Sequence, residues 1–154
     1  MMNTRLTHTL LRSDSGLAAL VLRLPLGIIL AAHGAQKLFG WFGGYGLDGT
    51  GQWMASIGLE PGFLMALLAG SAEFFGGLAL ALGLLTRPAA IVSAFTMLVA
   101  LFSVHIDNGL FMANNGYEYA LALFAATAAL AIQGAGRYSF DQWLLSKLAA
   151  KSRG

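Results

Sequence analysis

Four long apolar stretches divide the chain, and each is long enough to cross a lipid bilayer as a helix. They run from about Leu17 to Phe39, Phe63 to Leu85, Pro88 to Ile106 and Tyr117 to Ala135. A helical crossing needs about 20 residues, whereas the strands of a membrane barrel are shorter and alternate apolar with polar residues. Because lipid offers the backbone no hydrogen-bond partner, the pattern predicts four transmembrane helices.

Two further segments carry a pattern of their own. Residues 139–150 predict a short amphipathic helix along the inner membrane surface, with Ser139 and Gln142 at capping-box spacing and Lys147 facing anionic lipid. Residues 40–62 are rich in glycine and aromatic side chains and predict an outer loop. Two interpretations of this loop stay open, namely an anchor at the lipid headgroups and a cap over a pocket.

The composition supports a membrane protein and excludes several other classes. Of the 154 residues, 57% are hydrophobic and 10% are charged, where a soluble domain has about 25% charged residues. A soluble enzyme and a disordered chain are therefore poor descriptions, and we expect a lipid bilayer and no nucleic acid as partner. The sequence has no cysteine, which excludes thiol chemistry within the chain. We expect one domain over residues 1–154: an all-α, four-transmembrane-helix bundle with a C-terminal amphipathic interfacial helix.

The charged residues between the spans predict the orientation. Basic residues flank one end of the predicted spans: Arg5, Arg12, Arg87, Arg137, Lys147, Lys151 and Arg153. Acidic residues lie in the other two connections: Asp48, Glu60 and Asp107. Since basic loops stay inside the cell, both termini are predicted to be cytoplasmic. A cleaved signal peptide is the less favoured alternative, because the first apolar stretch is long enough to act as an anchor.

Ionisable residues inside the spans are the strongest clues to function, because burying a charge in a bilayer is costly. At about 100° per residue, one face of the first span carries a row of polar and small residues: Arg23, Gly27, Leu30, Gly34 and Lys37, with His33 beside it. In the second span Glu73 shares a face with Ala66, Gly70, Gly77 and Leu80. Small residues allow helices to approach closely, so we expect these two faces to pack together.

The direction of the side chains indicates which ionisable groups meet. Because side chains lean towards the N-terminus of their own helix, Glu73 and His33 converge, and this pair is favoured. A pair between Arg23 and Glu73 stays open, because arginine is long. Lys37, His105 and Glu118 fall in the outer half of the bundle or at its edge. We therefore expect a polar pocket in the outer half, built from all four helices, with Glu73 at its floor.

This pocket predicts proton chemistry next to a bound molecule. Glu73 and His33 are the candidate catalytic residues, because a carboxylate and an imidazole can exchange protons. Arg23, Lys37, His105 and Glu118 are the candidate ligand-binding residues. A metal site is not expected, because no His-x-x-x-His or Glu-x-x-His spacing is present. The alternative is that these groups only satisfy one another and fix the bundle.

Three motifs extend this interpretation. They read His33-Gly-Ala-Gln-Lys37-Leu-Phe-Gly, Ala72-Glu73-Phe-Phe-Gly-Gly and Gly134-Ala-Gly-Arg137-Tyr-Ser-Phe-Asp141. With them, the chain resembles the DoxX family of bacterial four-helix membrane proteins from about Leu22 to Leu145. The family's motif residues map onto Arg23, His33, Lys37 and Glu73.

The resemblance implies a multi-pass protein of the bacterial plasma membrane with a quinone-linked role. The family takes its name from a small subunit of an archaeal terminal quinol oxidase, and related proteins are linked to thiosulfate:quinone oxidoreduction. A mycobacterial relative is described as a membrane partner in a redox-stress complex. The expected function is thus a redox-associated subunit that binds a quinone, together with redox-protein partner subunits or further copies of itself. A non-catalytic membrane scaffold or small-solute carrier is the alternative, and whether the chain is itself an enzyme stays open.

Overall fold

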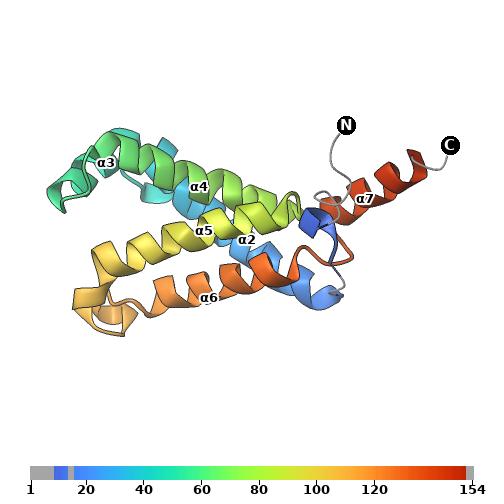
Figure 1. Cartoon of the computed structure of the whole chain (residues 1–154). Helices are drawn as coiled ribbons and strands as arrows, with labels where there is room; N and C mark the ends of the chain where they lie inside the picture. The colour runs from blue at the N-terminus through green and yellow to red at the C-terminus, as the bar shows by residue number, and fades with distance from the viewer. Residues whose placement is uncertain (1–8, 14–15, 152–154) are drawn as a thin grey trace.

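A computed structural model describes residues 9–13 and 16–151, and every regular element in this part of the chain is a helix (Figure 1). The longer helices are α2 (Leu17–Phe39), α3 (Gly46–Ser56), α4 (Gly62–Leu82), α5 (Thr86–Ala100), α6 (Glu118–Gln133) and α7 (Phe140–Lys151). Helices α2, α4, α5 and α6 lie side by side as a bundle, with α3 at one end and α7 beyond the other (Figure 1). We call these the α3 end and the α7 end. The predicted all-α fold is confirmed.

Three helical segments are long and apolar enough to cross a membrane: Leu17–Phe39, Gly62–Leu82 and Thr86–Asn108. Helix α6 is apolar but has only 16 residues. At about 1.5 Å per residue it is roughly 24 Å long, which is less than the ~30 Å of a bilayer core. The four crossings therefore stay a prediction, although α6 packs beside α5 within the bundle.

The two faces of small residues pack together as predicted, and they bring α2 and α4 into very close contact. A Cβ atom on Gly27 would lie 2.5 Å from the backbone nitrogen of Ala81, and one on Gly77 would lie 2.6 Å from the carbonyl oxygen of Gly27. Only glycine permits such an approach of two backbones. The spacing of these glycines therefore sets which residues of α2 and α4 face each other.

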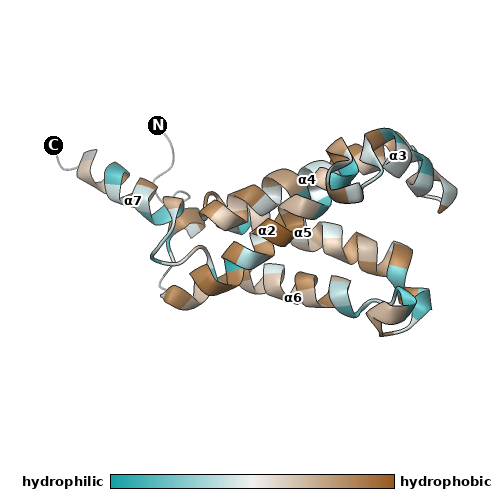
Figure 2. Cartoon of the chain, turned by 180° about the vertical axis from the view of Figure 1, so that it is seen from behind, coloured by the Kyte–Doolittle hydropathy of each residue, from teal (hydrophilic) through white to brown (hydrophobic). Residues whose placement is uncertain are grey.

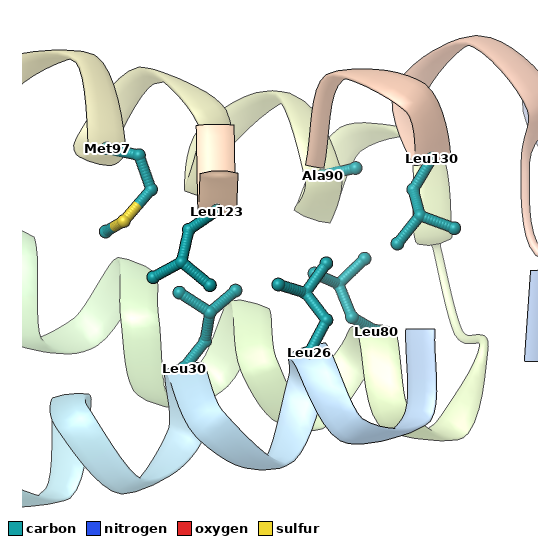
Figure 3. Close-up of a cluster of buried hydrophobic side chains, with 7 residues drawn as sticks. All are labelled: Leu26, Leu30, Leu80, Ala90, Met97, Leu123 and Leu130. Carbon is teal, nitrogen blue, oxygen red and sulfur yellow. The ribbon is translucent and has the colours of Figure 1, made fainter. Parts of the chain in front are cut away.

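Aliphatic side chains fill the middle of the bundle (Figure 3). The buried cluster draws on all four helices and contains Leu26, Leu30, Leu80, Ala90, Met97, Leu123 and Leu130. The outward faces are also apolar, with exposed Val21, Ile28, Phe75 and Phe95. Hydropathy colouring shows brown along the sides of the bundle and more teal near its ends (Figure 2). Such apolar sides suit lipid rather than water.

The connection residues on which the orientation prediction rests lie at opposite ends of the bundle where the structure describes them. At the α7 end, the Arg87 guanidinium donates hydrogen bonds to the carbonyls of Arg12, Ala131 and Ile132. At the α3 end, Asp48 lies in α3, and Asp107 lies in the connection between α5 and α6. Arg5 and Arg153, which also carried the orientation prediction, lie outside the described residues. The orientation itself stays a prediction.

The segment 40–62 is not a simple loop, because residues Gly46–Ser56 form helix α3 against the start of α4. Sequence reasoning missed this helix because three of its eleven residues are glycine, which disfavours helix formation. Packing compensates: a Cβ atom on Gly51 would lie 3.0 Å from the Cα atom of Phe63. Thr50 and Met54 are buried on the same helix.

Helix α7 begins within a residue of its predicted start. The Ser139 hydroxyl accepts a hydrogen bond from the Gln142 N–H at 3.2 Å, which is the N-cap contact that the spacing predicted. The helix projects away from the α7 end of the bundle (Figure 1). Its position along a membrane surface stays a prediction.

Candidate functional site

A partly buried ion pair lies between α2 and α4. Lys37 Nζ lies 2.5 Å from Glu73 Oε2, and Glu73 is only 3% exposed. The favoured partner of Glu73 from the sequence was His33, and this assignment is corrected, because the ion pair is made by Lys37. The alternative pair between Arg23 and Glu73 is likewise not the one that forms.

The geometry of α2 explains why lysine is the partner. Lys37 lies one helical turn beyond His33, and its long side chain leans back towards the N-terminus of α2. Its carbon stem passes close to α4 because residue 70 is glycine, where a Cβ atom would lie 3.2 Å from Lys37 Cβ. The stem can be buried while the ammonium group reaches the carboxylate. A lysine at the edge of the span therefore reaches an acid near its centre.

A cavity of about 430 Å³ opens beside this ion pair, and we call it the bundle cavity. Its polar lining comes from His33, Lys37, Glu73, His105, Asn115 and Tyr119. Its apolar lining includes Leu30, Met97, Ala100, Met112, Ala120 and Leu123. Helices α2, α4, α5 and α6 all contribute, and His33 and Glu73 share the same cavity although no direct pair links them. A ligand with a polar head and an apolar body fits this division.

Tyr119 is a member of the site that sequence reasoning did not identify. Its ring lies 6.0 Å from the ring of His33, measured between centroids, with 51° between the planes. One signal was present, because Tyr119 precedes Leu123 by four residues and so shares its helical face. Its phenol adds a hydroxyl that can both donate and accept a hydrogen bond.

His105 reaches the bundle cavity because the helix changes its winding. After α5 the residues Leu101–His105 form a π-helical turn, in which each N–H bonds five residues back. Continued as an α-helix, His105 would lie about 80° around the axis from Met97, but the wider turn reduces this to roughly 10°. His105 therefore faces the same cavity as Met97.

A backbone contact assigns the two nitrogens of His105. Nδ1 lies 2.8 Å from the carbonyl oxygen of Asn115. A carbonyl oxygen can only accept, so Nδ1 carries the hydrogen of this bond. In the neutral imidazole, Nε2 is then the nitrogen without a hydrogen and can accept a proton.

Arg23 and Glu118 lie apart from the bundle cavity. The Arg23 side chain is buried at the α7 end, where it donates hydrogen bonds to the carbonyls of Leu80, Ala81, Ala135 and Tyr138. Glu118 Oε1 accepts a hydrogen bond from the Met112 N–H at 2.6 Å, which fixes the connection before α6. The structure thus brings His33, Lys37, Glu73 and His105 together, and places the other two predicted residues in contacts with the backbone.

Within the described residues, no three side chains of His, Cys, Asp or Glu gather closely enough to hold a metal ion.

Comparison with known proteins finds a family and several relatives that the chain is similar to. The sequence profile of the DoxX family matches residues 18–106. The protein named "Inner membrane protein YqjF" of Escherichia coli is 35% identical, over 83% of this chain and 92% of that protein. The protein named "Putative oxidoreductase CatD" of Bacillus subtilis is also 35% identical, over 74% of this chain and 78% of that protein. No solved structure matches the chain significantly.

Proposed function

This chain belongs to the DoxX family of membrane proteins, and we propose that it is a redox-associated subunit that binds the head of a quinone in the bundle cavity. The observation that carries the proposal is the Lys37–Glu73 ion pair, whose carboxylate is buried although the pair borders a cavity of about 430 Å³. An ion pair of purely structural use needs no open space beside it. The name of the Bacillus subtilis relative points to the same kind of chemistry.

The lining residues fit a quinone on chemical grounds. A quinone head is flat and apolar except for two carbonyl oxygens, which accept hydrogen bonds. The Lys37 ammonium has three donors and the Tyr119 hydroxyl has one. Leu30, Met97 and Leu123 supply the apolar wall against which a ring can lie.

In this proposal the chain supplies binding and protons, and a partner supplies electrons. Reducing a quinone to a quinol consumes two electrons and two protons. Glu73 and the Nε2 atom of His105 can each hold a proton within the bundle cavity, and His33 lies beside them. Since the sequence has no cysteine, the electrons would come from a redox protein docked on this subunit. We also propose that the subunit can assemble with further copies of itself, which would add binding sites and no electron donor.

Binding of a short-chain quinone to the purified protein in lipid nanodiscs tests this proposal. We expect saturable binding of ubiquinone-1 by equilibrium dialysis, weakened about tenfold or more by Glu73→Gln or Lys37→Met, because each removes a charged hydrogen-bonding group. Asp48→Asn is the matched control, since Asp48 is exposed on α3. An absence of saturable binding to the native chain would contradict the proposal.

A non-catalytic scaffold or small-solute carrier is the second candidate. The observation in its favour is that Lys37 and Glu73 satisfy each other directly at 2.5 Å. For a scaffold, Glu73→Gln would lower stability while the native protein binds no quinone. For a carrier, radiolabelled solute would accumulate in proteoliposomes.

We also propose that the chain forms one domain of the inner membrane, with four crossings and both termini in the cytoplasm. The support is the separation of charge, with Arg87 and Arg137 near the α7 end and Asp48 and Asp107 at the α3 end. The name of the Escherichia coli relative also places that protein in the inner membrane. In this orientation the α3 end faces the outside of the cell.

A further inference from the structure

A second cavity lies at the α3 end, and the proposed function does not use it. It has a volume of about 490 Å³, and we call it the loop cavity. Its lining includes Gln36, Lys37, Gly44, Tyr45, Thr50 and Trp53, from α2, α3 and the glycine-rich connection between them. Tyr45 and Trp53 are exposed, so this cavity is open to the surroundings of the α3 end.

Thr50 is a buried polar residue of this lining whose hydroxyl has no partner. Only 6% of the residue is exposed, and its hydroxyl makes no hydrogen bond to any described residue. Buried hydroxyls nearly always have a partner. The Thr127 hydroxyl in α6, for example, donates to the carbonyl of Leu123 at 2.8 Å. Because Thr50 lines the loop cavity, a molecule bound there can supply the missing partner.

The first turn of α3 offers further donors to the same space. No side chain caps this end of the helix, so the N–H groups of the first turn have no partner within the helix. Tyr45 precedes the helix and Gly49 belongs to its first turn, and both line the loop cavity. The N-terminus of a helix carries a partial positive charge, which favours an anion.

The charge of the lining also favours a negative ligand. Among the described residues that line the loop cavity, Lys37 carries the one charge and no carboxylate is present. Glu73 takes up one of the three N–H donors of the Lys37 ammonium but lies outside this lining. Asp48, the acid in the first turn of α3, lies outside it as well. Gln36 can donate a further hydrogen bond through its amide.

We propose that the loop cavity is a binding site for an oxyanion such as a phosphate group, held by the Thr50 hydroxyl, the first turn of α3 and Lys37. The exposed rings of Tyr45 and Trp53 suit an apolar group attached to that oxyanion. Two sources supply this chemistry, namely the headgroup of a membrane lipid and free phosphate. The site is independent of the proposed quinone site, because Thr50 and α3 do not line the bundle cavity.

Tryptophan fluorescence can follow binding at this site. The sequence has three tryptophans, so Trp41→Phe combined with Trp143→Phe leaves Trp53 of the loop cavity as the reporter. The purified protein is kept in dodecyl maltoside, a detergent without phosphate. One arm is titrated with inorganic phosphate, and the other with dihexanoylphosphatidylglycerol below its critical micelle concentration. Sodium chloride keeps the ionic strength constant.

We expect a saturable change of Trp53 emission in at least one arm. Thr50→Val should weaken it about tenfold or more, because it removes a hydrogen bond to a charged group and keeps the shape of the side chain. Thr127→Val is the matched control, since Thr127 is a buried threonine outside this lining. Saturation by inorganic phosphate identifies the free anion as a sufficient ligand, and saturation by the lipid alone identifies the headgroup. No saturable change in either arm, or equal effects of the two valine substitutions, would overturn the proposal.

A second variant covers the case in which Thr50→Val does not fold. Gln36→Glu adds a carboxylate to the lining with nearly the same shape, and its repulsion should abolish the binding of both probes. Unchanged affinity in Gln36→Glu would overturn the anion site. Gln36 and Thr50 lie outside the lining of the bundle cavity, so ubiquinone-1 binding should be the same in both variants. Absence of quinone binding in a protein that binds phosphate would overturn the proposed function alone.

Discussion

Asp141 at the start of α7 accepts a hydrogen bond from the backbone N–H of Thr86 at 2.9 Å, and thereby caps α5 from a distant part of the sequence. The other carboxylate oxygen accepts the N–H of Leu85 at 2.6 Å, and the Asp141 N–H donates to the Gly83 carbonyl at 2.9 Å. Asp141 is 1% exposed. The α7 end is thus tied together through one carboxylate at a helix N-terminus.

Replacing Asp141 by alanine should lower the free energy of unfolding by about 1–3 kcal/mol, because the buried N–H of Thr86 and the partly buried N–H of Leu85 lose their acceptor. Asp141→Asn should lose less, since its amide oxygen can still accept one of the bonds. Thermal or denaturant unfolding in detergent measures both. Asp107→Asn, an exposed carboxylate at the α3 end, serves as the control, and an equal loss there would count against the capping role.

Arg23 should be a structural residue rather than a ligand-binding one. Arg23→Leu leaves four backbone carbonyls of the α7 end without their donor, and we expect a loss of about 3 kcal/mol or more of stability. Quinone affinity of the folded fraction should stay unchanged, because Arg23 lies outside the lining of the bundle cavity. Arg137→Lys is a matched exposed control. A selective loss of affinity with normal stability would restore the prediction made from the sequence.

The Lys37–Glu73 pair should show strong coupling in a double-mutant cycle. Lys37→Met alone leaves a buried carboxylate uncompensated and should cost about 3–5 kcal/mol. Lys37→Met with Glu73→Gln should recover most of that loss, because no lone charge remains. Unfolding free energies of the native protein, both single variants and the double variant give the coupling energy. Additive losses would mean that the two side chains stabilise the bundle independently.

The packing of α2 on α4 could be predicted because it depends on periodicity alone. Gly27, Gly34 and Lys37 follow one another at intervals of seven and three residues on one face, and Gly70, Glu73 and Gly77 at intervals of three and four on the other. Since both helices are regular, their faces could be assigned without coordinates. The buried position of Glu73 against α2 followed from the same argument.

The partner of Glu73 could not be predicted from helical faces. The tilt of side chains towards the N-terminus of their own helix favoured His33. How far a side chain reaches also depends on the space that neighbouring residues leave for it. Gly70 leaves room for the stem of Lys37, and this matters only once the separation of the two helices is known. Helix α3 was missed for a related reason, because its stability comes from packing on α4 rather than from its own residues.

The π-helical turn at Leu101–His105 has a consequence for how the site can change. The turn holds one residue more than a regular α-helix would need to cover the same arc. Deleting one of residues 101–104 would leave a regular α-helix with seven steps from Met97 to the imidazole, which then lies about 20° from Met97 around the axis and still on the cavity face. Inserting one residue would instead rotate the imidazole by roughly 100° and turn it away from the cavity. The site should therefore tolerate the loss of a codon in this turn better than the gain of one.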